Sequence, residues 1–184
     1  MIGLTTNADE VIAATQQWLE KAVIGLGLCP FAASVHLSNR IRYCVSEQQA
    51  TPGLLAELSR ELQHLQDADP LCCETTLLIH PLVLNNFQDY NAFLDEADAA
   101  LTALRLDGEL QIASFHPAYQ FADTAADDIE NYSNRSPFPM LHLLREASVT
   151  KAIAGFPGVD RIGSNNIATL RRLGHLGWQA LGLH

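Results

Sequence analysis

The sequence predicts one α/β domain, with a small layered sheet of three or more strands that is at least partly parallel and is flanked by about five helices. Two short, β-favouring segments, 75–80 (TTLLIH) and 110–115 (LQIASF), enclose a segment with clear helical periodicity. Strand, helix and strand in this order are typical of a parallel pair joined by a crossover. The 184 residues suit a single domain over 1–184, and 48% apolar with 17% charged residues is the composition of a folded chain.

The first part of the chain predicts two helices and a strand. A helix begins at Asn7, which forms a capping-box-like pair with Glu10. Proline is favoured at the first position of a helix, so Pro30 predicts a short helix with Cys29 at its N-cap. Apolar and polar residues alternate over 40–47, which predicts a half-buried strand.

The rest of the chain predicts four further helices around two strands. A helix opens at Thr51-Pro52, and the strand 75–80 is apolar enough to be covered on both faces. The helix that begins at Asn85 or Asn86 has apolar residues spaced alternately three and four positions apart, and the strand 110–115 follows it. Ser136 is a good N-cap for a helix with Pro137 in its first turn, and a last helix runs from Asn165 to about residue 181.

The charge balance restricts the partners of the protein. The formal net charge is −10, and no basic cluster is longer than Arg171-Arg172. Nucleic acid and anionic membrane surfaces would be repelled, so neither is an expected partner. A small anionic molecule could still bind at a local arginine. The N-terminal residues do not have the pattern of a secretory signal, no apolar run could span a membrane, and the four cysteines form no CxxC pair. We therefore expect a cytoplasmic protein with reduced thiols.

Two strands end in the same dipeptide. The first segment ends at His80, which Pro81 follows. The second segment, 110–115, is followed directly by His116-Pro117. If the two strands are parallel, both imidazoles emerge at the carboxyl edge of the sheet, where ligands bind in open α/β folds. Each proline stops its strand and restricts the preceding histidine to extended geometry. The sequence therefore predicts a functional site at this edge.

A long polar connection follows the second histidine. Residues 118–135 exceed the usual loop length, which indicates a functional or mobile segment that contains the acidic candidate Asp128. Arg135 would stand beside the helix N-terminus predicted at Ser136, and such a terminus is a ready anion site. Three polar residues of that predicted helix share one face by their spacing: His142, Arg145 and Glu146.

Four blocks of sequence, GLGLCPFA, TTLLIHP, QIASFHPAYQF and NRSPFPMLHLLRE, occur in this order over nearly the entire chain. With them the sequence resembles a bacterial family catalogued as domain of unknown function 1415. The resemblance implies a cytoplasmic single-domain bacterial protein and transfers no reaction. The positions that match the family's blocks are Cys29, Pro30, Phe31, His80, His116, Pro117, Tyr119, Asn134, Arg135, Ser136, His142, Arg145 and Glu146.

The leading hypothesis is a small-molecule enzyme that acts on an anionic substrate. His116 would be the general acid or base, His80 a second polar contact, and Asp128 the group that orients a histidine. Arg135 would hold the anion together with Asn134, Ser136, Tyr119 and the three polar residues of the predicted helix. Cys29 at a helix N-cap would have a lowered pKa and could act as a nucleophile. This hypothesis requires both histidines to face one cavity with Arg135.

Three alternatives remain open. A non-catalytic module could bind an anionic metabolite or a partner through the same arginines. A metal-dependent hydrolase or oxidoreductase would use His80, His116 and a third ligand from Asp128, His142 or Cys29, although no spacing typical of a metal site is present. A structural or assembly protein would have no concave pocket at the carboxyl edge. The sequence identifies no cofactor and no oligomeric state.

Overall fold

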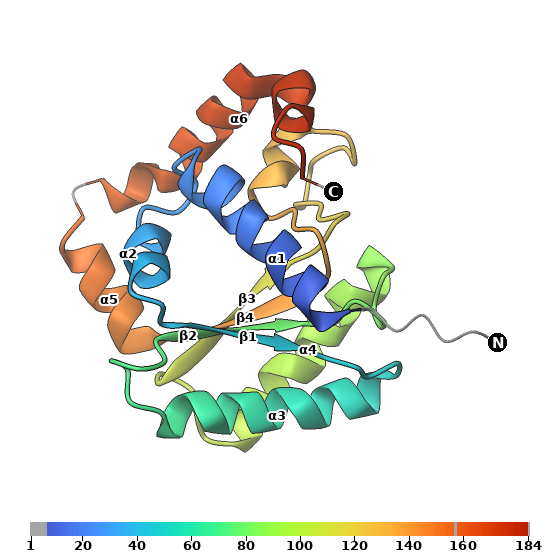
Figure 1. The fold of residues 1–184 in the computed structure, drawn as a ribbon, viewed down its shortest axis with the longest axis vertical. Helices are drawn as coiled ribbons and strands as arrows, with labels where there is room; N and C mark the ends of the chain where they lie inside the picture. Colours follow the sequence, from blue (N-terminus) through green and yellow to red (C-terminus); the bar gives the residue numbers. More distant parts are fainter. Residues whose placement is uncertain (1–6, 157, 184) are drawn as a thin grey trace.

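A four-stranded mixed sheet forms the centre of the molecule. The computed structural model describes residues 7–156 and 158–183, and Figure 1 shows its fold. The strands are β1 (Ile41–Val45), β2 (Thr75–Ile79), β3 (Leu110–Phe115) and β4 (Met140–Arg145), in the order β1-β2-β4-β3. β1 and β2 are parallel, whereas β4 is antiparallel to both of its neighbours. The predicted α/β class with a partly parallel sheet is confirmed.

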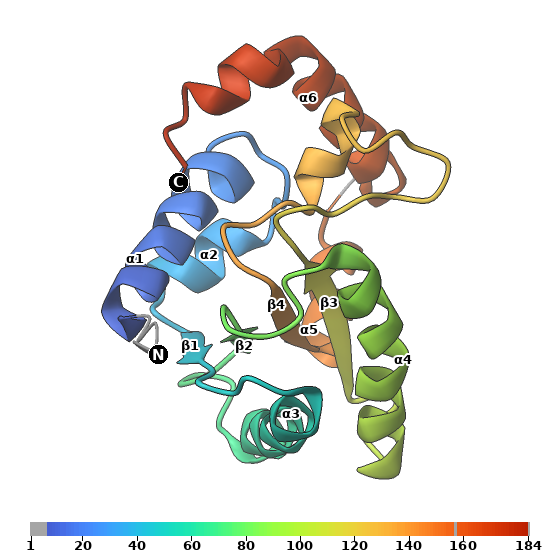
Figure 2. The ribbon, with the colours of Figure 1, turned by 90° about the vertical axis from the view of Figure 1, so that its right-hand side faces the viewer.

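Helices cover both faces of the sheet and give the layered architecture (Figures 1 and 2). On one face, α3 (Thr51–Asp67) and α4 (Phe87–Ala103) enclose a leucine-rich core that includes Leu78, Leu141 and Leu143. On the other face, α1 (Ala8–Trp18) and the π-helix η1 (Leu19–Ile24) pack on Leu77, Ile79 and Met140, and α2 (Ala32–Leu37) follows. All five residues of β2 are buried, as predicted for a strand covered on both faces.

The last quarter of the chain returns to the carboxyl edge of the sheet. After β4 come α5 (Glu146–Ala154), the short η3 (Val159–Arg161) and α6 (Ile162–Gln179). Figure 2 shows α6 beside the segment that follows β3, which contains the 3-10 helix η2 (Ile129–Ser133). α6 bends at Gly174, whose backbone has φ of 63° and ψ of 174°. A residue with a Cβ rarely adopts such a positive φ, so glycine permits the bend.

The prediction of a helix after Ser136 is wrong, because residues 140–145 form β4. Along β4 the side chains alternate between the two faces: Met140 faces α1, whereas Leu141 and Leu143 face α3 and α4. The four apolar residues of this segment, which lie on both faces, fit the period of a strand as well as that of a helix. Pro137 and Pro139 before it disfavour a helix. Pairing on both edges, with β2 and with β3, then decides for the strand.

The other helix predictions are mostly confirmed. Asn7 caps α1, accepting a hydrogen bond from the Asp9 amide at 3.1 Å, and Asn86 caps α4 in the same way. The prediction for Cys29 is wrong, because α2 begins at Ala32 and its N-cap is Phe31. Cys29 therefore lies three residues before the first residue of α2 and is not its N-cap.

The two His-Pro dipeptides leave the sheet at the same edge, as predicted. β2 and β3 are each antiparallel to β4 and are therefore parallel to each other, although β4 lies between them. The His80 amide donates to the carbonyl of Pro139 at 3.0 Å, and the His116 amide donates to the carbonyl of Asn134 at 3.2 Å. Residues 134–139, which lead into β4, are thus held between the ends of the two strands.

Candidate binding site

His80, Tyr90 and His116 form a ring cluster beneath the carboxyl edge of the sheet. All three side chains are buried. The Tyr90 ring lies 5.8 Å from that of His80 and 5.0 Å from that of His116, measured between centroids. The Tyr90 hydroxyl donates to the Met140 carbonyl at 2.8 Å and accepts from the Phe115 amide at 3.1 Å. This histidine–tyrosine cluster therefore ties β3, β4 and α4 together.

Both ring nitrogens of His116 are occupied by the backbone. Nδ1 accepts a hydrogen bond from the Ala118 amide at 3.0 Å, and Nε2 is 3.1 Å from the Leu84 carbonyl, to which it donates. Burial lowers the pKa of His116 below its usual value, so the ring is neutral at pH 7. A ring whose two nitrogens are both engaged has no site left for a substrate proton, so its geometry is that of a structural histidine.

His80 has one ring nitrogen without a partner among the described residues. Its Nδ1 donates to the Val83 carbonyl at 3.0 Å, which leaves Nε2 as an unprotonated acceptor in the interior. Burial, helped by the positive charge that His116 can carry, lowers the pKa of His80 to about 4. His80 is therefore a neutral core residue at physiological pH.

The connection between β3 and β4 is an ordered segment organised around the buried Asn131. The side-chain oxygen of Asn131 accepts from the Phe121 amide and the Thr124 hydroxyl, at 3.0 and 2.8 Å, and its amide group donates to the Ala125 carbonyl. Asp128 accepts from the Ala125 amide at 2.8 Å. Its carboxylate thus stabilises a turn of the segment, and the contact with a histidine that we predicted for Asp128 is not seen.

Arg135 is held in place by the same segment. Its Nε donates to the Tyr119 carbonyl at 3.3 Å, its Nη2 contacts the Ala126 carbonyl, and its guanidinium lies 4.2 Å above the ring of Tyr132. The ion pairs formed within the described residues involve other basic groups, so no carboxylate neutralises this guanidinium there. The predicted helix N-terminus beside Arg135 does not exist, because β4 follows. Among the described residues, the predicted anion site therefore has the Arg135 guanidinium and no helix N-terminus.

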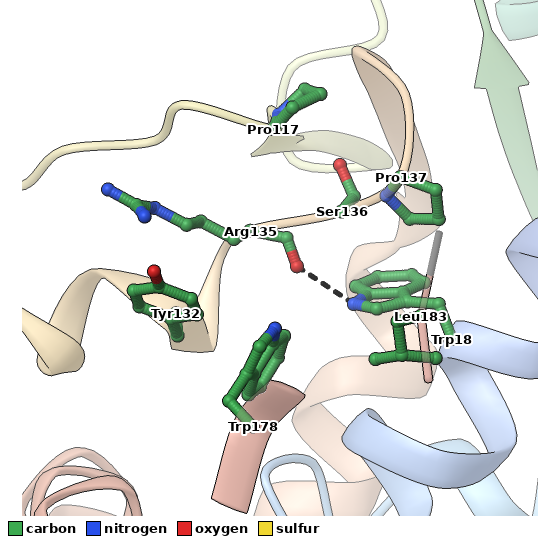
Figure 3. A pocket seen from close by; sticks show the side chains of 8 residues that line it. All are labelled: Trp18, Pro117, Tyr132, Arg135, Ser136, Pro137, Trp178 and Leu183. Atoms are coloured by element: carbon green, nitrogen blue, oxygen red, sulfur yellow. Dashed lines mark hydrogen bonds between the residues drawn. The ribbon is translucent and has the colours of Figure 1, made fainter. Parts of the chain in front are cut away.

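A pocket lies next to Arg135, and Figure 3 shows its lining. The hollow has a volume of about 280 Å³. Its walls come from the end of α1, the 117–137 segment, the end of α6 and the C-terminal tail. The lining residues are Trp18, Pro117, Tyr132, Arg135, Ser136, Pro137, Trp178 and Leu183. A concave pocket beside Pro117 does not fit the structural alternative, which required none at this edge.

Three aromatic side chains line the pocket: Trp18, Tyr132 and Trp178. The Trp18 Nε1 donates to the carbonyl of Arg135 at 2.8 Å, which fixes the backbone of the lining (Figure 3). The rings of Tyr132 and Trp178 meet edge to face, with centroids 5.0 Å apart. In Figure 3 the indole nitrogen of Trp178 points toward the backbone of Arg135 and Ser136, with no interaction drawn to it. We name the side chains of Trp18, Tyr132, Arg135 and Trp178 the aromatic–arginine pocket.

The structure brings some of the predicted site residues together and leaves others outside. Ser136 lines the pocket and donates to the Phe138 carbonyl at 2.7 Å. Asn134 lies outside the pocket lining, and its side-chain amide donates to the Ser114 carbonyl of β3 at 3.2 Å. Tyr119 offers its carbonyl to Arg135, and its ring packs on Phe87 and Phe121 instead of lining the pocket. Neither His80 nor His116 contributes to the lining, so the cavity shared with Arg135 that the enzyme hypothesis requires is not formed here.

Three predicted residues lie away from the pocket because they belong to β4 and α5. His142 pairs with Leu77 in mid-sheet, and its Nε2 is 2.7 Å from the Thr75 hydroxyl. Burial lowers the pKa of His142 to about 4. Arg145 closes the end of α3, with Nη2 at 2.6, 2.7 and 3.2 Å from the carbonyls of Leu65, Ala68 and Cys73. Glu146 begins α5, so the predicted common helix face of these three residues is wrong.

The remaining candidates do not assemble a metal site. Cys29 packs against the apolar core on the α1 face. Within residues 7–156 and 158–183, no group of three or more His, Cys, Asp or Glu side chains is arranged to hold a metal ion. The ligand set proposed for the metal-dependent alternative, two histidines with Asp128, His142 or Cys29, is therefore not brought together.

Sequence reasoning missed the aromatic part of the pocket. The sequence predicts none of Trp18, Tyr132 and Trp178 as a site residue. The chain contains just two tryptophans, and both line the same pocket although 160 positions separate them in the printed sequence. The scarcity of tryptophan is the signal that the sequence offers, and it does not predict that the two side chains line one pocket.

Fold and site together define an α/β domain with a four-stranded mixed sheet and an aromatic pocket between its carboxyl edge and its C-terminal helix. The chain belongs to the family described as Protein of unknown function (DUF1415), whose model matches residues 10–180. The resemblance found in the four sequence blocks is thereby confirmed. No curated protein and no solved structure matches the chain. In the part of the chain that the structure describes, no helix is both long and apolar enough to cross a membrane.

Proposed function

We propose that this domain is a binding module that holds a small anionic molecule in the aromatic–arginine pocket. The observation that carries the proposal is the environment of Arg135. Its guanidinium stands at the edge of a concave aromatic surface and has no carboxylate partner among the described residues. A guanidinium retains several N–H donors after two backbone contacts, and these match a carboxylate or phosphate.

The pocket is also preorganised, which favours binding. The hydrogen bonds from Trp18 to the Arg135 carbonyl and from His116 to the Asn134 carbonyl fix the backbone before a ligand arrives. A preformed site binds more tightly because less conformational entropy is lost on association. The histidine–tyrosine cluster therefore supports the pocket from below and need not take part in any reaction.

Binding without catalysis accounts for the geometry better than acid–base catalysis does. A general base must reach the proton that it removes, directly or through one water. Both ring nitrogens of His116 are hydrogen-bonded to backbone groups, and the unpaired Nε2 of His80 is buried outside the pocket lining. An enzyme of this family would need a different general base.

The proposal extends to the surroundings in which the protein works. The four cysteines are free thiols, which suits the reducing cytoplasm. A net charge of −10 disfavours nucleic acid and anionic lipid as partners, while a single charged metabolite can still reach one arginine. We therefore expect a soluble small-molecule ligand.

Ligand-induced thermal stabilisation tests the proposal. A panel of small carboxylates and phosphates is screened against the wild-type protein and the Arg135→Gln variant, with Arg172→Gln as a matched control. Arg172 is an exposed residue of α6, so both variants lose one positive charge. Stabilisation that persists in Arg172→Gln and disappears in Arg135→Gln supports the proposal. Equal stabilisation in both variants, or none in the wild type, would contradict it.

A further inference from the structure

We propose that the ligand of the aromatic–arginine pocket is a flat aromatic or heteroaromatic molecule that carries a single anionic group, as an aryl carboxylate does. This inference rests on the proposed function and names the chemical class of its ligand. The walls, the charge and the size of the pocket each support one part of it.

The walls select a flat ring. Trp18 and Trp178 approach the hollow from different helices, and Pro117 and Pro137 add rigid rings to the lining (Figure 3). Trp18 packs its edge on Phe115, at 5.3 Å between centroids, and Trp178 meets Tyr132 at 5.0 Å. These contacts hold the indoles in place, and aromatic rings gain energy from stacked or edge-on contacts beyond the area that they bury. An aliphatic group of equal size would lose that gain.

The charge selects an anion. A box of aromatic rings alone would suit a quaternary ammonium or another cation. Here the guanidinium of Arg135 already lies 4.2 Å above the ring of Tyr132, so it occupies this face and repels a second positive charge. The indole nitrogen of Trp178 adds another hydrogen-bond donor, which points toward the backbone of Arg135 and Ser136 (Figure 3). A positive charge over the Tyr132 ring and a further donor on Trp178, both beside the same hollow, fit a ring that ends in a carboxylate.

The size limits the ligand to one or two rings. The volume of about 280 Å³ is near the lower end of the roughly 300–1,000 Å³ of small-molecule pockets, which is too small for a dinucleotide. The net charge of −10 further disfavours a polyphosphate, because every additional negative charge is repelled by the protein as a whole. A singly charged aromatic acid satisfies all three restrictions.

The two tryptophans make the test direct. In a ¹⁵N-labelled sample, the side chains of Trp18 and Trp178 give the only two indole N–H signals of the chain, and both belong to the pocket. Four probes are titrated: benzoate, cyclohexanecarboxylate as the non-aromatic anion, benzylammonium as the aromatic cation, and acetate as the anion without a ring. Each is added to wild type, Arg135→Gln and Arg172→Gln at one pH and ionic strength.

We expect benzoate to shift both indole signals saturably, with a dissociation constant at least about tenfold below those of cyclohexanecarboxylate and acetate. Arg135→Gln weakens benzoate by about tenfold or more, whereas Arg172→Gln binds it like wild type. The position of the Trp18 signal in the free Arg135→Gln variant reports whether its hydrogen bond to the backbone of residue 135 is retained.

Other outcomes separate the two proposals. If cyclohexanecarboxylate binds as tightly as benzoate, the aromatic preference is refuted while anion binding in the pocket stands. If benzylammonium binds more tightly than benzoate, the pocket is a cation box and both proposals fall. If no probe moves either signal at millimolar concentration, both proposals are likewise overturned.

Discussion

Two clusters of rings flank the carboxyl edge of the sheet, and they differ in how far hydrogen bonds within the protein occupy their polar atoms. In the histidine–tyrosine cluster, backbone groups occupy both polar functions of the Tyr90 hydroxyl and both nitrogens of His116. In the aromatic–arginine pocket, the guanidinium keeps N–H groups beyond its two backbone contacts. The comparison teaches that a polar side chain at a sheet edge can bind a ligand only if backbone groups do not already form hydrogen bonds with all of its donors and acceptors.

The largest expected effect concerns the protonation of the buried histidines. The pKa of His80 and that of His142 are both lowered to about 4 from the ordinary 6.5. Above pH 6.5 these rings are neutral in the folded and unfolded states, so the free energy of unfolding stays level. As the pH falls from 6.5 to 4, each of these histidines binds a proton in the unfolded chain but not in the folded chain. The free energy of unfolding therefore falls by roughly 3 kcal/mol for each histidine.

Urea unfolding between pH 4 and pH 8 measures this slope. His80→Gln should flatten the curve in the acid range, whereas His64→Gln, at an exposed position of α3, should leave its shape unchanged. Identical acid slopes in wild type and His80→Gln would show that this cluster is not the source of the pH dependence.

The second effect is the loss of the His116 ring itself. His116→Ala leaves the Leu84 carbonyl and the Ala118 amide without their partner and opens a cavity beside Tyr90, so the free energy of unfolding should fall by about 3 kcal/mol. Chemical denaturation measures the loss. A cost below about 1 kcal/mol would mean that this ring is not a structural tie and would revive its catalytic reading.

The third effect compares two tyrosines, one from each cluster. Tyr90→Phe removes a hydroxyl that bonds both the Met140 carbonyl and the Phe115 amide, so unfolding should become about 2 kcal/mol easier. For Tyr132→Phe we expect less than about 0.5 kcal/mol, because no described residue bonds the Tyr132 hydroxyl and the change keeps the aromatic contact with Trp178. Equal costs for the two variants, in matched thermal melts, would erase the contrast between the clusters.

The fourth effect, smaller than the expected loss in Tyr90→Phe, concerns Trp18. Trp18→Phe keeps most of the buried ring but loses the hydrogen bond to the Arg135 carbonyl, which should cost about 1 kcal/mol of stability. Because the bond positions the pocket backbone, hydrogen exchange of the amides at 132–136 should also accelerate. Exchange that is unchanged over this stretch would show that Trp18 does not hold the segment.

The fold could be predicted from the sequence wherever periodicity was unambiguous. The segment 87–103 has apolar residues three and four apart, and 75–79 is a short run of β-favouring residues, so α4 and β2 were recognised. Residues 140–145 could not be assigned in the same way. A six-residue segment with four apolar residues, buried on both faces, fits either a helix or a strand, and only its place between β2 and β3 decides.

The sequence predicts where the candidate site lies better than it predicts which atoms of the site can bind a ligand. His80, His116, Asn134, Arg135 and Ser136 do gather at the carboxyl edge, because the His-Pro strand ends and the loop that follows mark that edge. Which of their atoms remain unpaired depends on backbone groups such as the carbonyls of Val83 and Leu84, which accept hydrogen bonds from the two histidines. No local sequence pattern predicts that these carbonyls lie close to the rings. The tryptophan walls require contact between α1 and α6, a long-range feature outside the reach of sequence spacing.

The most direct test of the central claim is the dissociation constant of benzoate for wild type, Arg135→Gln and Tyr90→Phe, measured by calorimetry at a temperature where all three are folded. If ligands bind in the aromatic–arginine pocket while the histidine–tyrosine cluster is structural, Arg135→Gln weakens binding by about tenfold or more. Tyr90→Phe should then bind like wild type in spite of its lower stability. The reverse pattern, binding lost in Tyr90→Phe and kept in Arg135→Gln, would contradict the account and move the site to the buried histidines.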